Sequence, residues 1–266
     1  MTSRDSASPI LRVRGLTKTY RRRKWIGSAG DEVRALRGVD LDLCAGKTIA
    51  IVGASGGGKS TLARCVAGLE PATSGEIFFR DQKLGKPGDA RHHIQMIFQD
   101  SGASLNPRFS VAQALLEPLA IRQERNLNTS ERLRQVGLPE TLASQGTSQL
   151  SGGQKARLAL ARALAALGES GAAVLILDES LASLDLSVQA QMINLLVDLQ
   201  EKRGLAYLLI AHDLRLAAHL ADEIAVLFEG QIVERGAPHR LFAAPAHPHT
   251  AYLLKTLAAP DGSSRA

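Results

Sequence analysis

The chain is poor in cysteine and in long apolar runs. Only 2 of its 266 residues are cysteines, Cys44 and Cys65, which excludes a disulfide framework and favours a reducing compartment. No uninterrupted apolar stretch approaches the roughly 18 residues that a membrane span needs. The polar segment from Met1 to Pro9 lacks the apolar region of a signal peptide. We therefore expect a cytoplasmic globular protein.

The sequence also has little that would recognise nucleic acid. Aromatic residues make up 4% of it, too few for a platform on which bases stack. The formal net charge is +6, and the one dense basic cluster is the short run from Arg21 to Lys24. A solvated basic loop explains this cluster more simply than a nucleic-acid or membrane surface does, so no nucleic-acid partner is expected.

What the chain does contain is a phosphate-binding motif. The apolar run from Thr48 to Val52 predicts a buried strand, and the spacing after Lys59 predicts a helix that ends near Gly68. Between them stands G-x-x-x-x-G-K-S, whose glycines let backbone N–H groups approach phosphate oxygens. The dipole of the helix points at the same anion. The predicted nucleotide-binding residues are Gly53, Ala54, Ser55, Gly56, Gly57, Gly58, Lys59, Ser60 and Thr61.

Two of these residues have distinct chemical roles. Lys59 supplies a point charge to the β- and γ-phosphates, and the Ser60 hydroxyl is a ligand for Mg²⁺. ATP and Mg²⁺ are therefore the expected cofactors.

Strands and helices alternate along most of the chain, which predicts a parallel nucleotide-binding sheet. Alternating apolar and polar residues at 10–14 and 35–43 predict antiparallel strands with an irregular loop at 21–34. Further strands are expected at 75–79, 93–98, 172–177, 207–210, 224–228 and 231–234, and helices at 154–167 and 188–199. The tail after Pro238 is expected to be weakly structured.

The segment from about 100 to 150 differs in character and is predicted to be a helical insert. Ser110 and Gln113 form a capping-box signal for a helix through Leu119. A second helix is expected after Asn128, ending near Gly137.

Two further features carry chemistry. A buried strand ends in Asp178, which can hold Mg²⁺, and Glu179, which can polarise the water that attacks the γ-phosphate. Residues 150–154 read Leu-Ser-Gly-Gly-Gln at the start of a helix, where Ser151 and the glycine amides make a second anion site. A single nucleotide does not need two phosphate sites, unless the second site binds the nucleotide of a neighbouring subunit.

With these motifs in order, the chain resembles the ATPase subunit of an ATP-binding cassette transporter. The matching segments are 53–60, Gln99, LSGGQ at 150–154, LILDE at 175–179, Ser183-Leu184-Asp185 and His212. The resemblance implies an α/β fold: a RecA-like P-loop NTPase core with an N-terminal antiparallel β subdomain and an inserted α-helical subdomain. The implied bounds are 10–98 and 155–237 for the core, 99–154 for the helical subdomain and 238–266 for the C-terminal tail.

The resemblance also implies site roles. Glu179 and His212 are the implied catalytic residues, with His212 contacting the γ-phosphate and orienting Glu179. Tyr20 matches the aromatic residue that stacks on adenine, and Gln99 the residue that touches Mg²⁺ and links hydrolysis to the membrane partner. Two subunits sandwich two ATP molecules, so one subunit's LSGGQ caps the other's nucleotide. The implied nucleotide contacts outside the phosphate loop are Tyr20, Gln99, Ser151, Gly152, Gly153, Gln154 and Asp185; the implied Mg²⁺ ligands are Ser60, Gln99 and Asp178.

The resemblance also indicates a branch within this transporter family. Residues 99–108 and the tail from Gly230 to Leu254 resemble oligopeptide, dipeptide and nickel importers. Ser180-Leu181 replaces the family's usual Pro-Thr, which leans toward the nickel or metal-chelate subgroup. The absence of cysteine after Cys65 excludes the iron–sulfur site of some dipeptide members.

The implied partners are a second ATPase subunit, either a paralogue or a second copy, two transmembrane permease subunits and, indirectly, an extracytoplasmic solute-binding protein. The implied location is the cytoplasmic face of the inner membrane. The alternatives are a soluble cassette protein acting on nucleic acid or ribosomes, and a small-molecule kinase, in which LSGGQ would have no role. The transported substrate and the role of the basic loop stay open.

Overall fold

The computed structural model describes residues 8–21, 32–85, 89–100, 102–122, 128–168, 173–181 and 184–258. Its strands are β1 (Leu11–Arg21), β2 (Glu32–Leu43), β3 (Thr48–Val52), β4 (Ser74–Phe79), β5 (Gln82–Lys83), β6 (Ile94–Ile97), β7 (Val174–Asp178), β8 (Ala206–Ala211), β9 (Glu223–Phe228) and β10 (Gln231–Gly236). Its α-helices are α1 (Lys59–Val66), α2 (Val111–Arg122), α3 (Thr129–Gln135), α4 (Gly152–Leu167), α5 (Leu186–Arg203), α6 (Leu214–Leu220), α7 (Pro238–Ala243) and α8 (Pro248–Ala258). Short 3-10 turns occur at Asp89–His92, Glu140–Ser144 and Thr147–Gln149.

The central sheet has the order β10-β9-β3-β8-β7-β6, and its strands are parallel except for β10. The strands β3, β7 and β8 are buried along their whole length, as expected for a sheet covered on both faces. The predicted parallel sheet is confirmed, and the carboxyl ends of β3, β7 and β8 bring their following loops to one edge.

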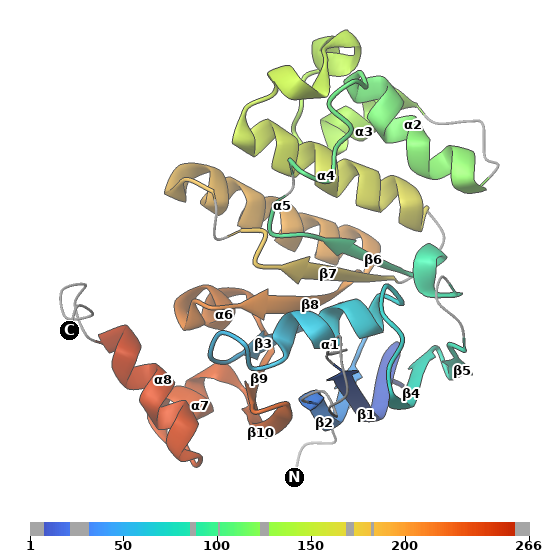
Figure 1. Cartoon of the computed structure of the whole chain (residues 1–266). Helices are drawn as coiled ribbons and strands as arrows, with labels where there is room; N and C mark the ends of the chain where they lie inside the picture. Colours follow the sequence, from blue (N-terminus) through green and yellow to red (C-terminus); the bar gives the residue numbers. More distant parts are fainter. Residues whose placement is uncertain are drawn as a thin grey trace, which may run out of the picture.

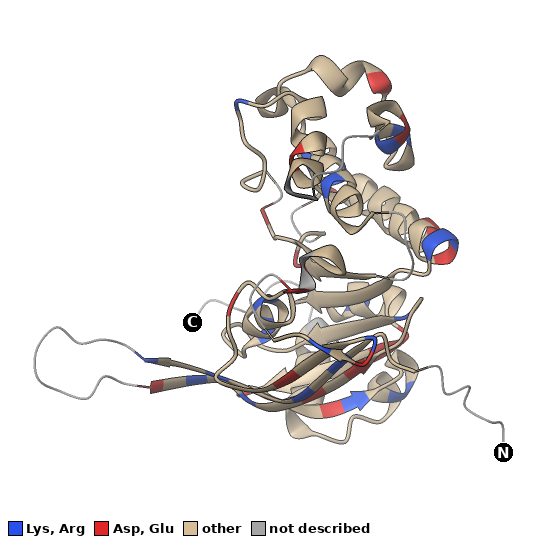
Figure 2. Cartoon of the chain, turned by 90° about the vertical axis from the view of Figure 1, so that its right-hand side faces the viewer, with Lys and Arg blue, Asp and Glu red and all other residues tan. Residues whose placement is uncertain are grey.

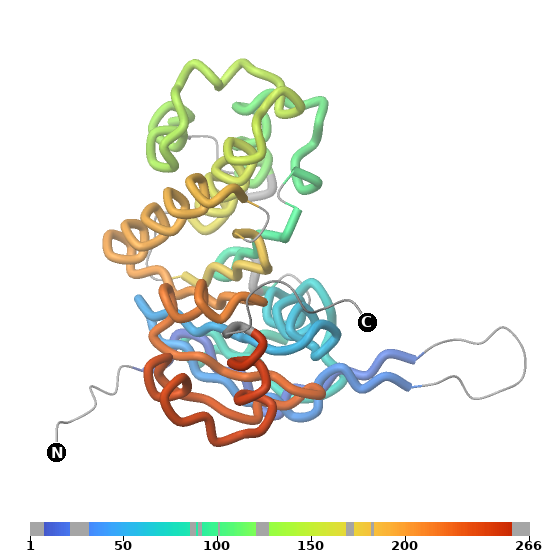
Figure 3. The backbone as a smooth tube through the Cα atoms, turned by 90° about the vertical axis from the view of Figure 1, so that its left-hand side faces the viewer, coloured from blue at the N-terminus to red at the C-terminus, as the bar shows by residue number. Residues whose placement is uncertain are grey.

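A second, antiparallel sheet has the order β2-β1-β4-β5. Helix α1 lies between the two sheets, because Leu62 and Val66 share one apolar cluster with Leu41 of β2 and Ile51 of β3 (Figure 1). The strands β1 and β2 run out beyond the body as a two-stranded ribbon (Figure 3), along which residues of both charges occur (Figure 2). Both strands are longer than the sequence pattern predicted, and residues 32–34, expected in a loop, belong to β2.

The opposite face of the central sheet is covered by helices. Leu175 and Leu209 point there and pack in the cluster that contains Leu160 of α4 and Leu196 of α5. The helices α2, α3 and α4 form the far end of the molecule in Figure 1. Both predicted helix starts are confirmed: Ser110 and Gln113 bond each other's backbone N–H, and Asn128 accepts the N–H of Glu131.

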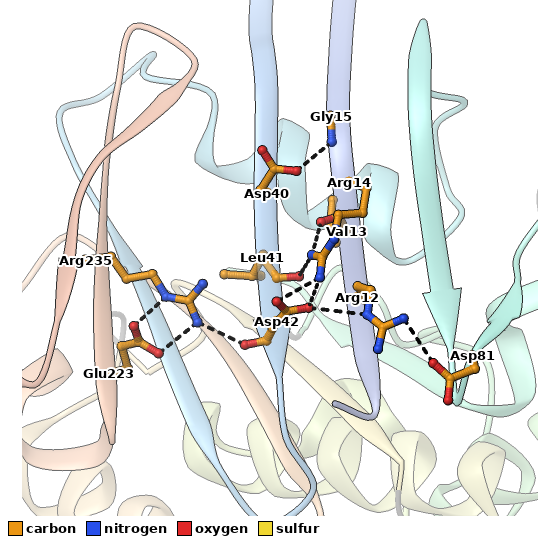
Figure 4. A network of polar contacts seen from close by, with 10 residues as sticks. All are labelled: Arg12, Val13, Arg14, Gly15, Asp40, Leu41, Asp42, Asp81, Glu223 and Arg235. Carbon is orange, nitrogen blue, oxygen red and sulfur yellow. Dashed lines mark hydrogen bonds and ion pairs between the residues drawn. The ribbon is translucent and has the colours of Figure 1, made fainter. Parts of the chain in front are cut away.

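Polar contacts tie the two sheets together at one edge (Figure 4). Arg235 of β10 pairs with Glu223 and donates to the Asp42 carbonyl of β2. The Asp42 carboxylate in turn accepts from Arg14 of β1 at 2.7 Å and pairs with Arg12 at 3.7 Å. The network links four strands, two from each sheet, so polar contacts as well as the apolar cluster around α1 hold the antiparallel subdomain to the core.

The expected weakly structured tail is wrong for residues 238–258, which form α7 and α8. Each helix begins with proline at its first position, where the missing N–H costs nothing. Leu241 and Thr250 are buried, and Glu234 of β10 accepts the N–H groups of Ala246 and His247. The two helices are therefore stabilised by docking onto the body. In the part of the chain that the structure describes, no helix has the length and apolarity to cross a bilayer.

Candidate nucleotide site

The predicted phosphate loop lies between β3 and α1, as expected. Gly53, Gly56 and Gly58 have φ of 155°, 77° and 101°, values that side-chain-bearing residues rarely adopt. Helix α1 starts at Lys59, so its free N–H groups face the concave side of the loop. The loop therefore has the backbone shape of an anion cradle.

The back of the loop packs against main chain from two other elements. A Cβ on Gly58 would lie 2.3 Å from the Ala35 carbonyl of β2, and one on Gly53 would lie 2.1 Å from the Leu227 carbonyl of β9. Gly230, in the β9–β10 turn, donates its N–H to the Gly57 carbonyl at 3.3 Å and accepts from Arg37 N–H at 2.8 Å. Glycine is thus required here by close approach as well as by φ. Ala35 and Gly230 support the loop through contacts between segments far apart in the chain, which no local sequence pattern reveals.

Lys59 is buried within the loop that it belongs to. Its ammonium group donates to the carbonyls of Gly53 at 2.9 Å and Ala54 at 3.0 Å. Burial lowers the pKa of Lys59, while the nearby carboxylates of Glu179 and Asp178 act in the opposite direction. A cation desolvated in this way gains most from an anion that enters the cradle.

Ser60 and Asp178 lie together at the start of α1 and the end of β7. The Ser60 hydroxyl donates to Asp178 Oδ1 at 3.2 Å. Burial raises the pKa of Asp178, and the hydrogen bond from Ser60 lowers it in part. A hydroxyl beside a carboxylate is a hard-oxygen pair of the kind that Mg²⁺ selects, with phosphate and water completing its shell. The residues therefore fit the predicted ion.

Glu179 and His212 are brought together from neighbouring strands. His212 Nε2 lies 2.6 Å from Glu179 Oε1, and the Glu179 side chain is 13% exposed. Glu179 has φ of 51°, a strained value for a residue with a side chain, and its N–H donates to the Ile210 carbonyl of β8 at 3.1 Å. Strain of this kind persists where surrounding contacts hold it, and here it aims the carboxylate at the histidine beside the phosphate loop.

Tyr20 lies near the end of β1 and is 37% exposed. Its hydroxyl donates to Glu70 Oε2 at 2.5 Å. Burial raises the pKa of Tyr20, Glu70 raises it further, and a hydrogen bond with Thr61 lowers it. The phenol is therefore next to Thr61, the residue directly after the phosphate-loop motif, which suits the expected adenine platform. Glu70 lies 50 residues further along the chain, so no local sequence pattern points to its contact with Tyr20.

The LSGGQ segment lies at the start of α4. Ser151 is the N-cap, and its hydroxyl accepts the Gln154 N–H while the Gln154 side chain accepts the Ser151 N–H. These two hydrogen bonds are internal to the motif, and Ser151 and Gly152 are exposed. A Cβ on Gly153 would lie 2.8 Å from Val188 of α5, whereas one on Gly152 would meet nothing within 4 Å. The open side of this motif is therefore free to meet another molecule.

The other predicted residues are exposed at the same edge or beyond it. Gln99 follows β6, and Asp185 is the N-cap residue of α5. Ser183 and residues 22–24 of the basic cluster lie outside the described residues.

Between β6 and the helices α2 and α4 is a groove of about 440 Å³. Met96, Phe98 and Ala163 line its apolar part. Arg162 crosses its polar part, pairing with Glu117 at 2.5 Å and donating to the Ser104 carbonyl at 2.8 Å. The groove ends at the residues that precede Gln99.

Residues 36–182 match the family model described as ABC transporter. The chain is 40% identical over 255 residues to the di/tripeptide transport ATP-binding protein DppF of Pseudomonas aeruginosa, covering 92% of this chain and 78% of that one. It is 42% identical over 270 residues to the oligopeptide transport ATP-binding protein OppD of Mycobacterium tuberculosis, covering 97% of this chain and 44% of that one.

A solved structure has the same fold. It is the dimeric, post-hydrolysis state of an ATP-binding cassette bound to ADP and Pi, with a TM-score of 0.71 and 26% identity. The match covers 86% of this chain and 98% of that one. The RecA-like α/β fold with an antiparallel β subdomain is thereby confirmed.

Proposed function

The chain belongs to the ABC transporter family of ATPases, and we propose that it is the ATP-hydrolysing subunit of an importer for short peptides. The observation that carries the proposal is the meeting of Lys59, the Ser60–Asp178 pair and the Glu179–His212 pair at one edge of the sheet. The names of the relatives favour peptides over the nickel or metal chelates left open by the sequence.

In the proposed reaction, each group has a separate task. The phosphate-loop amides and Lys59 bind the β- and γ-phosphates. Ser60 and Asp178 would hold Mg²⁺, with Gln99 as a further ligand, and would thereby place a divalent charge against the phosphates. Glu179 accepts the proton of the attacking water as general base. His212 orients the Glu179 carboxylate and contacts the γ-phosphate.

The second anion site is proposed to serve a second subunit. Ser151, Gly152, Gly153 and Gln154 would cap the nucleotide held by the partner's phosphate loop, with Asp185 beside it. The exposure of Ser151, Gly152 and Asp185 in this chain supports such a role. The partner is a related ATPase or a second copy of this chain.

The proposed complex also contains two transmembrane permease subunits and, indirectly, an extracytoplasmic solute-binding protein. We propose that a permease subunit docks in the groove between β6, α2 and α4, because the apolar wall of the groove ends at Phe98, directly before Gln99. The chain would then sit peripherally on the cytoplasmic face of the inner membrane. The alternative, a soluble cassette protein acting on nucleic acid or ribosomes, is not favoured by the relatives.

The first test changes Glu179 to Gln. Turnover of ATP should fall by the ~10²–10⁴-fold that a general base contributes, while ATP binding survives because Lys59 and the loop amides remain. Glu201→Gln, on the exposed side of α5, is the matched control and should leave turnover unchanged. Turnover of the Glu179→Gln variant within a few-fold of the original would contradict the assignment.

The second test changes Ser151 to Arg. ATP affinity of the monomer should be unchanged, since Ser151 does not contact its own phosphate loop, but ATP-driven dimerisation should be lost. Calorimetric titration and sedimentation with ATP measure the two effects. Loss of ATP affinity in the monomer would mean that both motifs line one pocket.

A further inference from the structure

The ring of Tyr20 is fixed at its far end by a carboxylate. The phenol donates to Glu70 Oε2 at 2.5 Å, the lower end of the range for a bond to an ionised acceptor. The phenol is partly buried at the level of Thr61. The ring is therefore held where β1 passes over the beginning of α1.

Glu70 is itself anchored to the end of α1. Its backbone N–H donates to the Arg64 carbonyl at 3.3 Å, and its side chain, 27% exposed, pairs with Arg64 Nη1 at 3.5 Å. The same helix begins at Lys59 in the phosphate loop. One rigid element thus carries the phosphate cradle at its start and the anchor of Tyr20 just beyond its end.

The segment after α1 is also bonded along β1. Lys18 Nζ donates to the Pro71 carbonyl at 2.7 Å and lies 5.0 Å over the Tyr20 ring centroid. The Thr73 hydroxyl accepts a hydrogen bond from the Thr19 N–H at 2.9 Å, and the Thr73 N–H donates to the Thr17 carbonyl at 2.8 Å. Lys18 therefore covers one face of the ring, so an incoming base has the opposite face to stack on.

We propose that Glu70 is a positioning residue for nucleotide binding: it holds the Tyr20 phenol so that the uncovered face of the ring is set at a fixed distance from the phosphate loop. The inference deepens the proposed function and rests on it, since it takes the ligand to be ATP. Glu70 acts through Tyr20 and contacts no part of the nucleotide.

The loss of ATP affinity that we expect without Glu70 follows from the rotational freedom that the Tyr20 ring would then have. A half-exposed tyrosine without its anchor must be immobilised when the base stacks on it, and that cost weakens binding. The expected loss of ATP affinity on removing the anchor is roughly three- to tenfold, by the usual cost of immobilising one side chain. Binding of a ligand that lacks a base should not change.

The experiment is a double-mutant cycle read by calorimetric titration with ATP and with inorganic tripolyphosphate. Glu70→Ala and Tyr20→Phe should each weaken ATP three- to tenfold, and the double variant should be no weaker than either, because each change removes the same bond. Glu70→Gln should retain most of the affinity, since its amide oxygen still accepts from the phenol. Tripolyphosphate affinity should be the same throughout.

If Glu70→Ala does weaken ATP binding, two results would still overturn the inference. One is a Glu70→Ala variant that weakens ATP as much in the Tyr20→Phe background as in the original chain. The other is an equal loss of tripolyphosphate affinity, which would mean that Glu70 acts on the phosphate loop. Glu76→Ala is the matched control, because Glu76 pairs with Lys83 at 2.5 Å on the neighbouring strands and has no contact with Tyr20.

Two further variants separate this inference from the proposed function. Lys59→Ala should remove binding of both ligands; if it does not, the nucleotide site is wrong. Tyr20→Ala should weaken ATP alone; if it does not, the aromatic platform is wrong and Glu70 has nothing to position. If both behave as expected and Glu70→Ala binds ATP like the original chain, only the positioning role is wrong. An alkaline titration followed by phenolate absorbance gives a readout without nucleotide, since loss of Glu70 should lower the raised pKa of Tyr20.

Discussion

The replacement of Ser180 by alanine should stabilise the protein. Ser180 directly follows the proposed general base, is 4% exposed, and its hydroxyl has no hydrogen-bond partner among the residues that the structure describes. It borders a cavity of about 10 Å³ whose other lining residues are apolar, among them Leu181 and Met192. A space of this size is at the lower limit for one water molecule, and it offers that water a single polar partner. The hydroxyl is therefore buried without compensation.

The expected magnitude follows from that burial. An unsatisfied buried hydroxyl costs about 1–3 kcal/mol, and removing it sacrifices only the packing of one oxygen atom. We expect Ser180→Ala to raise the free energy of unfolding by about 1 kcal/mol, or Tm by about 2–4 °C for a chain of this size. Thermal melts of the nucleotide-free protein measure the change.

The same substitution at Ser110 is the matched control. The Ser110 hydroxyl accepts the Gln113 N–H at 3.2 Å at the start of α2, so Ser110→Ala should lower stability by about 1 kcal/mol. A Ser180→Ala variant that melts below the original chain would mean that the hydroxyl has a partner after all and would refute the reasoning.

Two further predictions concern the phosphate loop and its neighbour. Burial raises the pKa of Asp178, so the folded chain binds the proton of this carboxyl group more tightly than the unfolded chain does. The free energy of unfolding therefore falls as pH rises through the folded pKa of Asp178, where the buried carboxylate becomes charged. Asp178→Asn should therefore raise the Tm of the nucleotide-free protein at pH 7, with the gain vanishing in acid; an equal gain at all pH values would contradict this. Gly58→Ala should lower Tm much more than Gly56→Ala does. Both glycines have positive φ, but only a Cβ on Gly58 would clash with main chain, at 2.3 Å from the Ala35 carbonyl. Equal losses of Tm would show that the backbone angle alone matters.

The predictable features were those encoded within a few neighbouring residues. The phosphate loop, the capping box of Ser110, the helix that starts at LSGGQ, and the strand that ends in Asp178 each depend on local spacing, and the structure has them where the sequence predicted. The parallel order of the central strands followed from the alternation of strands and helices, which leaves few other connections.

The features that could not be predicted depend on contacts between distant segments. Helices α7 and α8 have little pattern of their own, since what orders them is docking and the carboxylate of Glu234, 12 residues before Ala246. The Tyr20–Glu70 bond joins residues 50 apart. Even the length of β1 was underestimated, because its outer half is held by pairing with β2 and not by an apolar face of its own.

The contact between Gly58, Gly230 and Ala35 is made of main-chain atoms and lies behind the phosphate loop. A contact of this kind has no side chain that could be exchanged to retune it. Related chains can therefore change charge, volume and polarity all around the loop while its curvature stays the same, as long as the two glycines persist. Substitutions that adapt such a chain to another transported substrate or another partner then fall on surfaces that do not contact the phosphate loop. The affinity for ATP is therefore independent of the transported substrate.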